Sequence, residues 1–208
     1  MSGNHGAPHS AAAWDERYSG ERVWSGNPNQ ALVAEVEDLS PGRALDVGCG
    51  EGADAVWLAG RGWRVTGLDI STRAVDLTRA AATQAGVSVD GVASGLVEAP
   101  LQLGSFDLVS ALFPVLLRTP ERVVEHRLLD LVAPGGTLLV VHHADIDRDH
   151  AREHGCDPDA YVSPEDVRAL AEEVGGWRVV TDEQRTRDAV HGAGARHHDD
   201  LIVRLQRL

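Results

Sequence analysis

The residues of this chain most suited to chemistry form a glycine-rich turn and an acid that follows it. Residues 48–52 read Gly-Cys-Gly-Glu-Gly after the apolar run 44–47, and Asp69 closes a second apolar run 21 residues after Gly48. Because glycine has no side chain, alternating glycines let a ligand approach the backbone closely. An acid one strand over can accept hydrogen bonds from both hydroxyls of a ribose. The pattern therefore predicts a nucleoside-containing cofactor.

Two cofactor classes fit this first prediction, dinucleotides and S-adenosylmethionine. The dinucleotide fingerprint spaces its glycines as G-x-G-x-x-G and sets a helix N-terminus against an anionic pyrophosphate. Here the spacing is G-x-G-x-G, with Asp46 just before the turn and Glu51 inside it. Two carboxylates repel a pyrophosphate but suit an ammonium group and a sulfonium centre, so the turn favours S-adenosylmethionine. The alternative is that Asp46 and Glu51 only hydrogen-bond the turn itself.

Strands and helices must alternate along the chain to bring these residues to one place. Strands are expected at 43–47, 63–69, 87–92, 106–113, 137–142, 177–181 and 201–205, and helices at 53–61, 71–85, 119–131 and from 163 onward. Such alternation forces parallel pairing through right-handed crossovers. The roughly 20 residues before the last strand hold no convincing helix, so that strand should pair antiparallel. The predicted fold class is α/β, a Rossmann-like doubly wound sheet of seven strands, mostly parallel with an antiparallel last strand.

The N-terminal part of the chain divides into a tail and an aromatic segment. Residues 1–13 are small and polar, which predicts a flexible tail, and residues 14–208 form a single domain. The segment 14–39 carries Trp14, Tyr18 and Trp24 and then an apolar helical rhythm. The three aromatics either anchor the segment to the domain or form a lid that shields the reaction from water. Asn27 beside them is expected to orient a polar substrate.

The composition excludes several classes of function. The 19 basic residues, all arginine, against 32 acidic ones give a net charge of −13. That charge repels phosphate backbones and anionic lipids, so neither nucleic acid nor membrane is expected as a partner. The absence of lysine excludes Schiff-base chemistry and a phosphate-loop lysine. Two cysteines and no signal-like or membrane-spanning apolar run predict a cytoplasmic protein, whose oligomeric state the sequence does not indicate.

Four blocks of the sequence resemble one family in content and in order. They are 45–52 (Leu-Asp-Val-Gly-Cys-Gly-Glu-Gly), 67–71 (Gly-Leu-Asp-Ile-Ser), 105–109 (Ser-Phe-Asp-Leu-Val) and 131–136 (Leu-Val-Ala-Pro-Gly-Gly). The chain resembles the class I S-adenosylmethionine-dependent methyltransferases through these blocks. Within that family, the aromatic N-terminal segment is similar to small bacterial enzymes of the tellurite-resistance and thiopurine-like type.

The resemblance implies where the cofactor, S-adenosyl-L-methionine, and its product, S-adenosyl-L-homocysteine, would bind. The expected cofactor-binding residues are Asp46, Gly48, Cys49, Gly50, Gly52, Asp69, Ile70, Ser94, Gly95, Ser110 and Leu112. The glycines would line the methionine and ribose, Asp69 would hold the ribose hydroxyls and Ile70 would lie on the adenine. The family often places an acid after the third strand for the adenine amino group, and Ser94 stands there instead. Residues 110–113 would lie beside the transferable methyl group, with Phe113 toward the substrate.

The methyl acceptor is expected to be a small molecule. Methyl transfer from a sulfonium is an in-line displacement, so the protein mainly aligns the acceptor and excludes water. The fourth strand ends in Leu-Phe-Pro at 112–114, without the motifs of amino methylation or of a cytosine nucleophile. The alternative functions are a nucleotide-dependent oxidoreductase and a non-catalytic S-adenosylmethionine-binding protein.

Histidines gather at two places that the predicted topology brings to one edge. One group is His142, His143, His150 and His154, and the other is His191, His197 and His198 with the acids at 199–200. Imidazoles beside carboxylates can serve as a base or hold a metal, and the plain alternative is solvated loop histidines. We expect His142 and His143 to be the catalytic residues, and no metal is expected, because the histidines lack a fixed ligand spacing.

Overall fold

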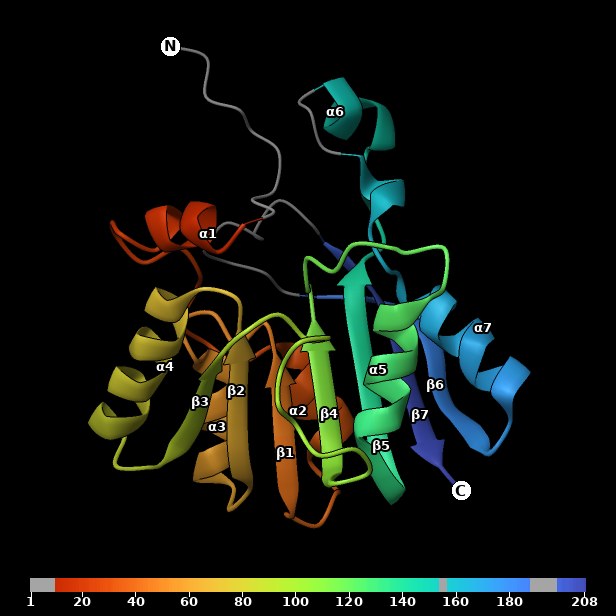
Figure 1. Ribbon diagram of the computed structural model, residues 1–208, viewed down its shortest axis with the longest axis horizontal. Helices are drawn as coiled ribbons and strands as arrows, with labels where there is room; N and C mark the ends of the chain where they lie inside the picture. The colour runs from red at the N-terminus through yellow and green to blue at the C-terminus, as the bar shows by residue number, and fades with distance from the viewer. Residues whose placement is uncertain (1–9, 154–156, 188–197) are drawn as a thin grey trace.

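Seven strands form one sheet whose order reverses between β1 and β4 (Figure 1). The computed structural model describes residues 10–153, 157–187 and 198–208. The strands are β1 (Arg43–Val47), β2 (Arg64–Asp69), β3 (Val89–Ala93), β4 (Phe106–Leu112), β5 (Val132–His143), β6 (Trp177–Thr186) and β7 (Asp199–Arg207). Their spatial order is β3-β2-β1-β4-β5-β7-β6. Ligands of such sheets bind outside the carboxyl ends of the strands near the reversal, which lies between β1 and β4.

The pairing directions match the predicted topology. Strands β1, β2, β3, β4 and β5 pair parallel, whereas β7 runs antiparallel to both β5 and β6. The predicted α/β fold with a seven-stranded, mostly parallel sheet and an antiparallel last strand is therefore confirmed. In the β5–β7 register His143 lies opposite Asp200, so the end of β5 and the start of β7 share the carboxyl edge.

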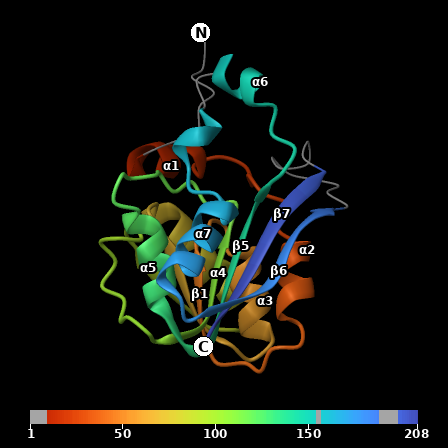
Figure 2. The same cartoon turned by 90° about the vertical axis from the view of Figure 1, so that its right-hand side faces the viewer.

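Helices cover both faces of the sheet (Figure 2). They are α1 (Ala11–Arg17), α2 (Gln30–Val36), α3 (Ala53–Gly60), α4 (Thr72–Gln84), α5 (Val123–Leu131), α6 (Arg148–Glu153) and α7 (Pro164–Val174). Apolar residues of α5 and α7 form one buried cluster with the sheet, and those of α2, α3 and α4 form another on the opposite face. Two predicted helix starts have the expected caps: Ser71 accepts a hydrogen bond from Ala74 N, and Ser163 forms a capping box with Asp166.

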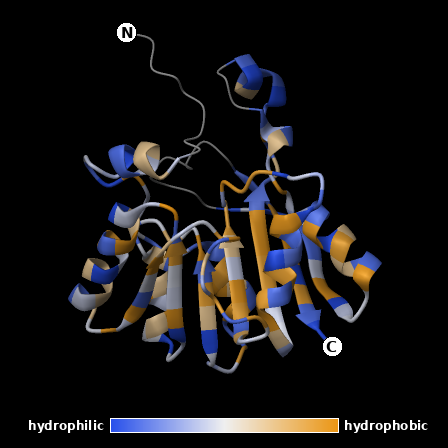
Figure 3. Cartoon of the chain, viewed as in Figure 1, coloured by the Kyte–Doolittle hydropathy of each residue, from blue (hydrophilic) through white to orange (hydrophobic). Residues whose placement is uncertain are grey.

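The structure differs from the sequence-based expectation at several elements. Helix α5 begins at Val123 rather than at 119, and strand β6 extends to Thr186 rather than ending at 181. Helix α1 begins at Ala11 with Ser10 as its cap, inside the segment predicted as a tail, and residues 1–9 of that tail lie outside the described part of the chain. Helix α6, which was not predicted, is short and entirely exposed or half-buried, and it appears blue in Figure 3 above the orange strands. Strand β5 starts at Val132 rather than at 137, because Val132 already pairs with Phe106; the register then shifts, and the extra residues of β5 lie before Thr137 pairs with Leu108.

The helix that precedes β1 is tied to the β6–β7 hairpin through a buried carboxylate. Glu35 of α2 accepts hydrogen bonds from Thr181 Oγ1 and Arg185 Nη2, both at 2.7 Å. Burial opposes the ionisation of Glu35, but these two hydrogen bonds and the charges of Arg185 and Arg204 together hold the pKa of Glu35 below its usual value. Helix α2 is thereby held against β6, the edge strand of the sheet.

None of the helices in the described ranges has both the length and the apolar character needed to cross a bilayer. The longest of them, α4, has 13 residues.

Candidate active site

The three glycines of the turn after β1 have positive φ angles and three different surroundings. At Gly48 (φ 75°) no described atom lies within 4 Å of the position that a Cβ would take. At Gly50 (φ 52°) a Cβ would lie 3.1 Å from Tyr18 Oη, and at Gly52 (φ 85°) it would lie 2.8 Å from Thr78 Cα. Gly48 therefore leaves room for a ligand, Gly50 lies against the N-terminal segment and Gly52 allows α3 to approach α4.

The ribose-binding acid predicted from the sequence lies directly beside this turn. Asp69 is 8% exposed, and its Oδ2 accepts a hydrogen bond from Gly50 N at 3.0 Å while its Oδ1 accepts one from Ser71 N at 2.9 Å. Burial raises the pKa of Asp69, and the two amide hydrogen bonds act against that rise. Because a carboxylate oxygen has two lone pairs, each oxygen keeps the capacity to accept a ribose hydroxyl.

A second acid, at the end of β1, has a polar atom without a partner. Asp46 is 3% exposed, its Oδ1 accepts a hydrogen bond from Ser110 Oγ at 3.3 Å, and its Oδ2 has no hydrogen-bond partner among the described residues. Burial raises the pKa of Asp46, and the nearby charge of Asp54 raises it further. Buried carboxylate oxygens normally have a donor, so this oxygen fits a ligand that brings an ammonium group.

The remaining predicted cofactor-binding residues occupy different positions around this centre. Ile70 is 40% exposed at the end of β2, whereas Leu112 is buried in the core on the α2 side. Cys49 is buried with its Sγ 3.4 Å from Thr78 Oγ1, and burial raises the pKa of its thiol. The Cys49 thiol is therefore turned into the core between β2 and α4.

The loop after β3 holds an acid that sequence reasoning missed. Ser94 donates its N–H to Asp69 O at 2.9 Å and its hydroxyl to Gly95 O at 3.1 Å. A Cβ on Gly95 would collide with the carboxylate of Glu98. The turn 95–99, closed by a hydrogen bond from Ala99 N to Gly95 O, brings the Glu98 carboxylate beside Gly95, the residue after Ser94.

The aromatic segment lies over the glycine turn. Glu51 accepts hydrogen bonds from Val23 N at 3.0 Å and from Trp24 N at 2.9 Å, and Trp24 Nε1 donates to Tyr18 Oη at 3.1 Å. Tyr18 is 5% exposed, and Arg73 at the start of α4 donates to its backbone carbonyl at 2.7 Å. Glu51 thus binds the N-terminal segment, a role that the sequence did not indicate.

Other residues of the segment make contacts beside the turn. Trp14 stacks on Tyr18 with ring centroids 5.7 Å apart. Asp15 accepts hydrogen bonds from Ser71 Oγ at 2.5 Å and from Arg73 N at 3.1 Å, and these bonds lower its pKa. Asn27, predicted as a substrate residue, lies in an exposed turn with its N–H bonded to Ser25 Oγ, so the structure does not bring its backbone amide to the site.

Further along the chain, Asn29 contacts the acid that raises the pKa of Asp46. Asn29 donates from its backbone N and from its Nδ2 to the Asp54 carboxylate, at 2.7 and 2.6 Å. Burial raises the pKa of Asp54, and the two hydrogen bonds from Asn29 act against that rise.

A ring cluster lies at the carboxyl ends of β4 and β5. Phe113 has a φ of 52°, which is uncommon for a residue with a side chain. Its ring stacks on His143, with centroids 4.4 Å apart and an interplanar angle of 24°. The guanidinium of Arg187, which follows β6, lies 5.0 Å from the Phe113 centroid. Strain of this kind gathers at functional sites, where surrounding contacts hold it in place.

Both predicted catalytic histidines have their Nδ1 atoms next to donors. His143 N donates to His142 Nδ1 at 3.1 Å, and Arg187 Nη2 lies 3.3 Å from His143 Nδ1. Arg187 Nε also pairs with Asp200 Oδ1 at 3.3 Å, while His143 Nδ1 lies 3.8 Å from that same oxygen. Sequence reasoning had placed acids near these histidines but had no signal for Arg187, which enters from a different strand.

Some residues that the sequence analysis considered lie outside the part of the chain that the structure describes. His154, Cys156, His191 and His197 lie outside the described residues. Within the described ranges, no three histidine, cysteine or acidic side chains come together as a metal site.

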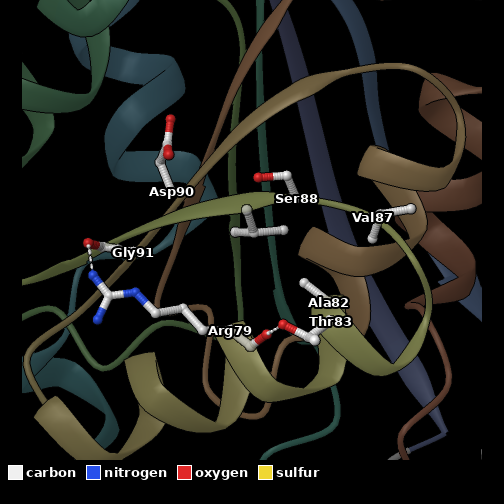
Figure 4. Close-up of a pocket in the computed structure, with 8 residues that line it drawn as sticks. Arg79, Ala82, Thr83, Val87, Ser88, Asp90 and Gly91 are labelled. Atoms are coloured by element: carbon white, nitrogen blue, oxygen red, sulfur yellow. Dashed lines mark hydrogen bonds between the residues drawn. The ribbon is translucent and has the colours of Figure 1, made fainter.

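A hollow lies between α4 and β3 (Figure 4). It measures about 290 Å³ and is lined by polar and apolar residues of α4, of β3 and of the connection between them, among them Arg79 and Asp90. Arg79 closes one side by donating to Gly91 O at 2.9 Å.

The sequence matches known methyltransferases over the sheet core. Residues 44–136 match the family described as a methyltransferase domain. A ribosomal RNA small subunit methyltransferase C from Alcanivorax borkumensis is 29% identical over 146 residues, covering 67% of this chain and 44% of that protein. A ubiquinone biosynthesis O-methyltransferase from Erwinia tasmaniensis is 36% identical over 99 residues, covering 47% of this chain and 40% of that protein. The match spans less than half the length of either curated relative.

Solved structures are similar over nearly the whole chain. One, described as the conversion of a disulfide bond into a thioacetal group during echinomycin biosynthesis, has a TM-score of 0.74 at 26% identity and covers 95% of this chain and 92% of that chain. The N-methyltransferase NodS from Bradyrhizobium japonicum, in complex with S-adenosyl-L-homocysteine, has a TM-score of 0.70 at 18% identity and covers 96% and 99%. The latter likeness shows a shared fold.

Proposed function

The chain belongs to the class I S-adenosylmethionine-dependent methyltransferases, and from this we propose that it transfers the cofactor's methyl group to a small-molecule nucleophile. One observation carries the proposal. The unpartnered Asp46 Oδ2, the open space at Gly48 and the Asp69 carboxylate follow one another at the carboxyl ends of β1 and β2. That series of groups suits a ligand with an ammonium group at one end and a ribose at the other.

The chain's own residues supply binding and alignment. The cofactor, when bound, supplies a methyl group activated by a sulfonium sulfur. Asp46, held by Ser110, would take the ammonium group, and Asp69 would take the ribose hydroxyls. The exposed side chain of Ile70 would cover one face of the adenine. Phe113 would border the acceptor, so that the reaction is an in-line displacement between fixed partners.

The N-terminal segment is part of this proposal as a lid. Its hydrogen bonds end on Glu51, Ser71 and Arg73, which are neighbours of the cofactor residues in sequence and in space. Tyr18 and Trp24 lie directly over Gly50. A lid in this position would exclude water from the methyl group while the acceptor is aligned.

A small-molecule acceptor is favoured over RNA by the charge of the chain. A net charge of −13 opposes approach to a phosphate backbone, which is the main source of affinity in RNA-binding proteins. The ubiquinone O-methyltransferases among the relatives support a small acceptor, and the echinomycin neighbour supports sulfur among the acceptor atoms to be tested. The ribosomal RNA relative makes RNA the competing acceptor.

Calorimetric titration with S-adenosylmethionine, S-adenosylhomocysteine and NAD tests the cofactor. We expect both sulfur ligands to bind and NAD not to bind. Asp69→Ala should weaken binding by about 1–3 kcal/mol, roughly 5- to 150-fold, because its hydrogen bonds to the ribose are lost. Asp90→Ala, which removes an exposed acid from β3, is the matched control and should bind as the unmodified chain does.

A panel of acceptors tests the second half of the proposal. Thiols, phenols, amines and small-subunit ribosomal RNA are each incubated with the enzyme and labelled S-adenosylmethionine. Label should appear in a small molecule. Label in the RNA alone would replace the small-molecule acceptor with RNA, and failure of both sulfur ligands to bind would overturn the proposed function as a whole.

A further inference from the structure

We infer that binding of the cofactor at the glycine turn releases a proton: Asp46 is protonated while the site is empty and gives up that proton when an ammonium group arrives beside it. The inference rests on the proposed function, because the ammonium group is that of S-adenosylmethionine or its product. It adds a property that the fold does not imply, a cofactor affinity that depends on pH. The observations that carry it are the hydrogen-bond partners of Asp46 and of the acids around it.

One hydroxyl proton serves two acceptors at the end of β1. Ser110 Oγ lies 3.3 Å from Asp46 Oδ1 and also 3.3 Å from Leu45 O. A serine hydroxyl has a single proton, so it can donate to only one of these oxygens at a time. Among the described residues, this shared hydroxyl is the one donor that forms a hydrogen bond with the Asp46 carboxyl, because Oδ2 has no partner.

A protonated Asp46 gives every proton of this set its own acceptor. The carboxyl O–H on Oδ1 donates to Ser110 Oγ, and the Ser110 hydroxyl is then free to donate to Leu45 O. The Oδ2 atom becomes a neutral carbonyl oxygen instead of half of a carboxylate. Burying an uncharged oxygen without a partner costs far less than burying a charge. The hydrogen-bond pattern therefore favours the protonated form at a residue that is 3% exposed.

The other acids at this turn have more donors than Asp46 has. Each accepts hydrogen bonds from two N–H groups, at distances between 2.6 and 3.0 Å; these acids are Glu51, Asp54 and Asp69. Two such donors stabilise the charged form of a carboxylate. These three acids thus carry the negative charges of the turn, and Asp46 is the member of the group that can hold a proton.

The charges around Asp46 act in the same direction. Burial raises the pKa of Asp46, the charges of Asp54 and Asp69 raise it further, and the hydrogen-bond donors nearby act against the rise. The Cys49 thiol at the same turn stays neutral, because burial raises its pKa as well. Within residues 10–153, 157–187 and 198–208, no arginine or histidine forms an ion pair with any of these acids.

An ammonium group reverses this balance. It brings a positive charge and N–H donors to Asp46 Oδ2, the oxygen without a described partner. An opposite charge next to a carboxyl group lowers its pKa, so the Asp46 proton leaves to solvent and a carboxylate–ammonium pair remains. One proton is released for each cofactor bound, and no covalent bond other than that O–H bond breaks or forms in the protein.

The consequence is a cofactor affinity that rises with pH. Below the pKa of Asp46 in the empty chain, binding has to displace a proton, so the dissociation constant should fall by up to about 10-fold for each pH unit. Above that pKa the proton is already absent, and the affinity levels off. The sign follows from the two states: the empty site holds the proton and the occupied site does not.

Calorimetric titration with S-adenosylhomocysteine in buffers of different ionisation enthalpy counts the protons. Between pH 5 and 7, where the amino group of the ligand is an ammonium, the binding enthalpy should vary linearly with the ionisation enthalpy of the buffer. The slope should correspond to release of up to one proton. 5′-Methylthioadenosine, which keeps the adenosine and lacks the ammonium group, is the matched ligand and should bind without releasing a proton.

The outcomes of this titration are distinguishable. A slope of zero with S-adenosylhomocysteine throughout the pH range overturns the inference. Equal release with both ligands also overturns it, because the proton would then belong to Asp69 at the ribose. Failure of S-adenosylhomocysteine to bind would instead overturn the proposed function.

Substitution identifies the group that holds the proton. Asp46→Asn should bind S-adenosylhomocysteine without proton release and with an affinity that is constant over the same pH range. Asp54→Asn removes a neighbouring negative charge, so its proton release should be confined to lower pH than in the unmodified chain. Asp90→Asn, the same change at an exposed acid of β3, is the matched control and should release the proton as the unmodified chain does. Release that persists in Asp46→Asn overturns the inference.

Infrared difference spectra test the same point without any variant. Binding of S-adenosylhomocysteine to the unmodified chain should remove the band of one protonated carboxyl group. That band should shift when the chain is labelled with carbon-13 aspartate. Difference spectra at pH 5 without such a band overturn the inference, whatever the stability of the variants.

Discussion

Replacement of Glu51 by glutamine tests whether the N-terminal segment controls cofactor exchange. The Glu51 carboxylate accepts two backbone hydrogen bonds from the segment, at 3.0 and 2.9 Å. A glutamine keeps one carbonyl oxygen for one of these N–H groups and turns its own NH₂ toward the other. The change therefore removes about one charge-assisted hydrogen bond. It also places the glutamine NH₂ next to a backbone N–H, so that two hydrogen-bond donors face each other.

The size of the effect follows from that count. A hydrogen bond to a charged group contributes about 1.5–3 kcal/mol, and partial exposure of Trp24 places this one at the lower end. About 1.4 kcal/mol corresponds to a factor of 10. Glu51→Gln should therefore speed the dissociation of S-adenosylhomocysteine about 10-fold, because opening of the segment becomes easier by that amount.

Stopped-flow displacement of bound S-adenosylhomocysteine measures the dissociation rate, and amide hydrogen exchange at Val23 and Trp24 reports the opening of the segment. Arg73→Gln, which removes the bond from the guanidinium to Tyr18 O, should speed dissociation through a different contact. Glu21→Gln changes an exposed acid of the same segment and is the control. Faster exchange at Val23 and Trp24 with an unchanged dissociation rate would refute the gating role.

Two further predictions concern the glycine turn and the acid before it. Asp46→Asn should raise the free energy of unfolding of the ligand-free chain by about 0.5–2 kcal/mol at pH 7, because burial raises the pKa of Asp46 and its charge destabilises the folded state at any pH above the unfolded value. In thermal melts from pH 7 to 3 that gain in stability should vanish as the pH falls below about 4. Calorimetry should show weaker S-adenosylmethionine binding. A lower Tm of Asp46→Asn at pH 7 would contradict the raised pKa of Asp46. Gly52→Ala should lower the free energy of unfolding by about 2–4 kcal/mol, since a Cβ would meet Thr78 Cα at 2.8 Å on a backbone with a φ of 85°. In Gly48→Ala the added Cβ meets no described atom, so urea unfolding should show a smaller loss of the free energy of unfolding. Equal losses in the two variants would show that backbone strain, and not the contact with Thr78, determines the loss.

The number of strands and their pairing directions could be predicted because they depend on local patterns. Short apolar strands that alternate with amphipathic helices indicate a parallel sheet. The lack of a helix before the last strand indicates that this strand pairs antiparallel to its neighbour. The same reasoning placed His142 and His143 at the edge that Asp200 shares, which the β5–β7 register confirms. The sequence was therefore sufficient to predict which residues lie at the ends of strands.

The contacts between distant segments could not be predicted in this way. Nothing in the spacing of Glu51 indicates that its carboxylate binds Val23 and Trp24, because that contact depends on how the segment folds back. Arg187, which directly follows β6, likewise reaches His143 through a long side chain. The partners of the two imidazoles therefore could be seen only in the structure.

The tie between Glu35 and the β6–β7 hairpin determines where the proposed lid pivots. Helix α2 is held at one end by Asn29 on Asp54 and in its body by Glu35 on Thr181 and Arg185. The hinge of the proposed lid would therefore be residues 25–28, which include Gly26 with a φ of 78°. Movement of the N-terminal segment about this hinge would uncover the cofactor end of the site and leave the β6–β7 hairpin in place. In the proposed mechanism, spent cofactor would then be exchanged for fresh cofactor while the β6–β7 hairpin stays in place.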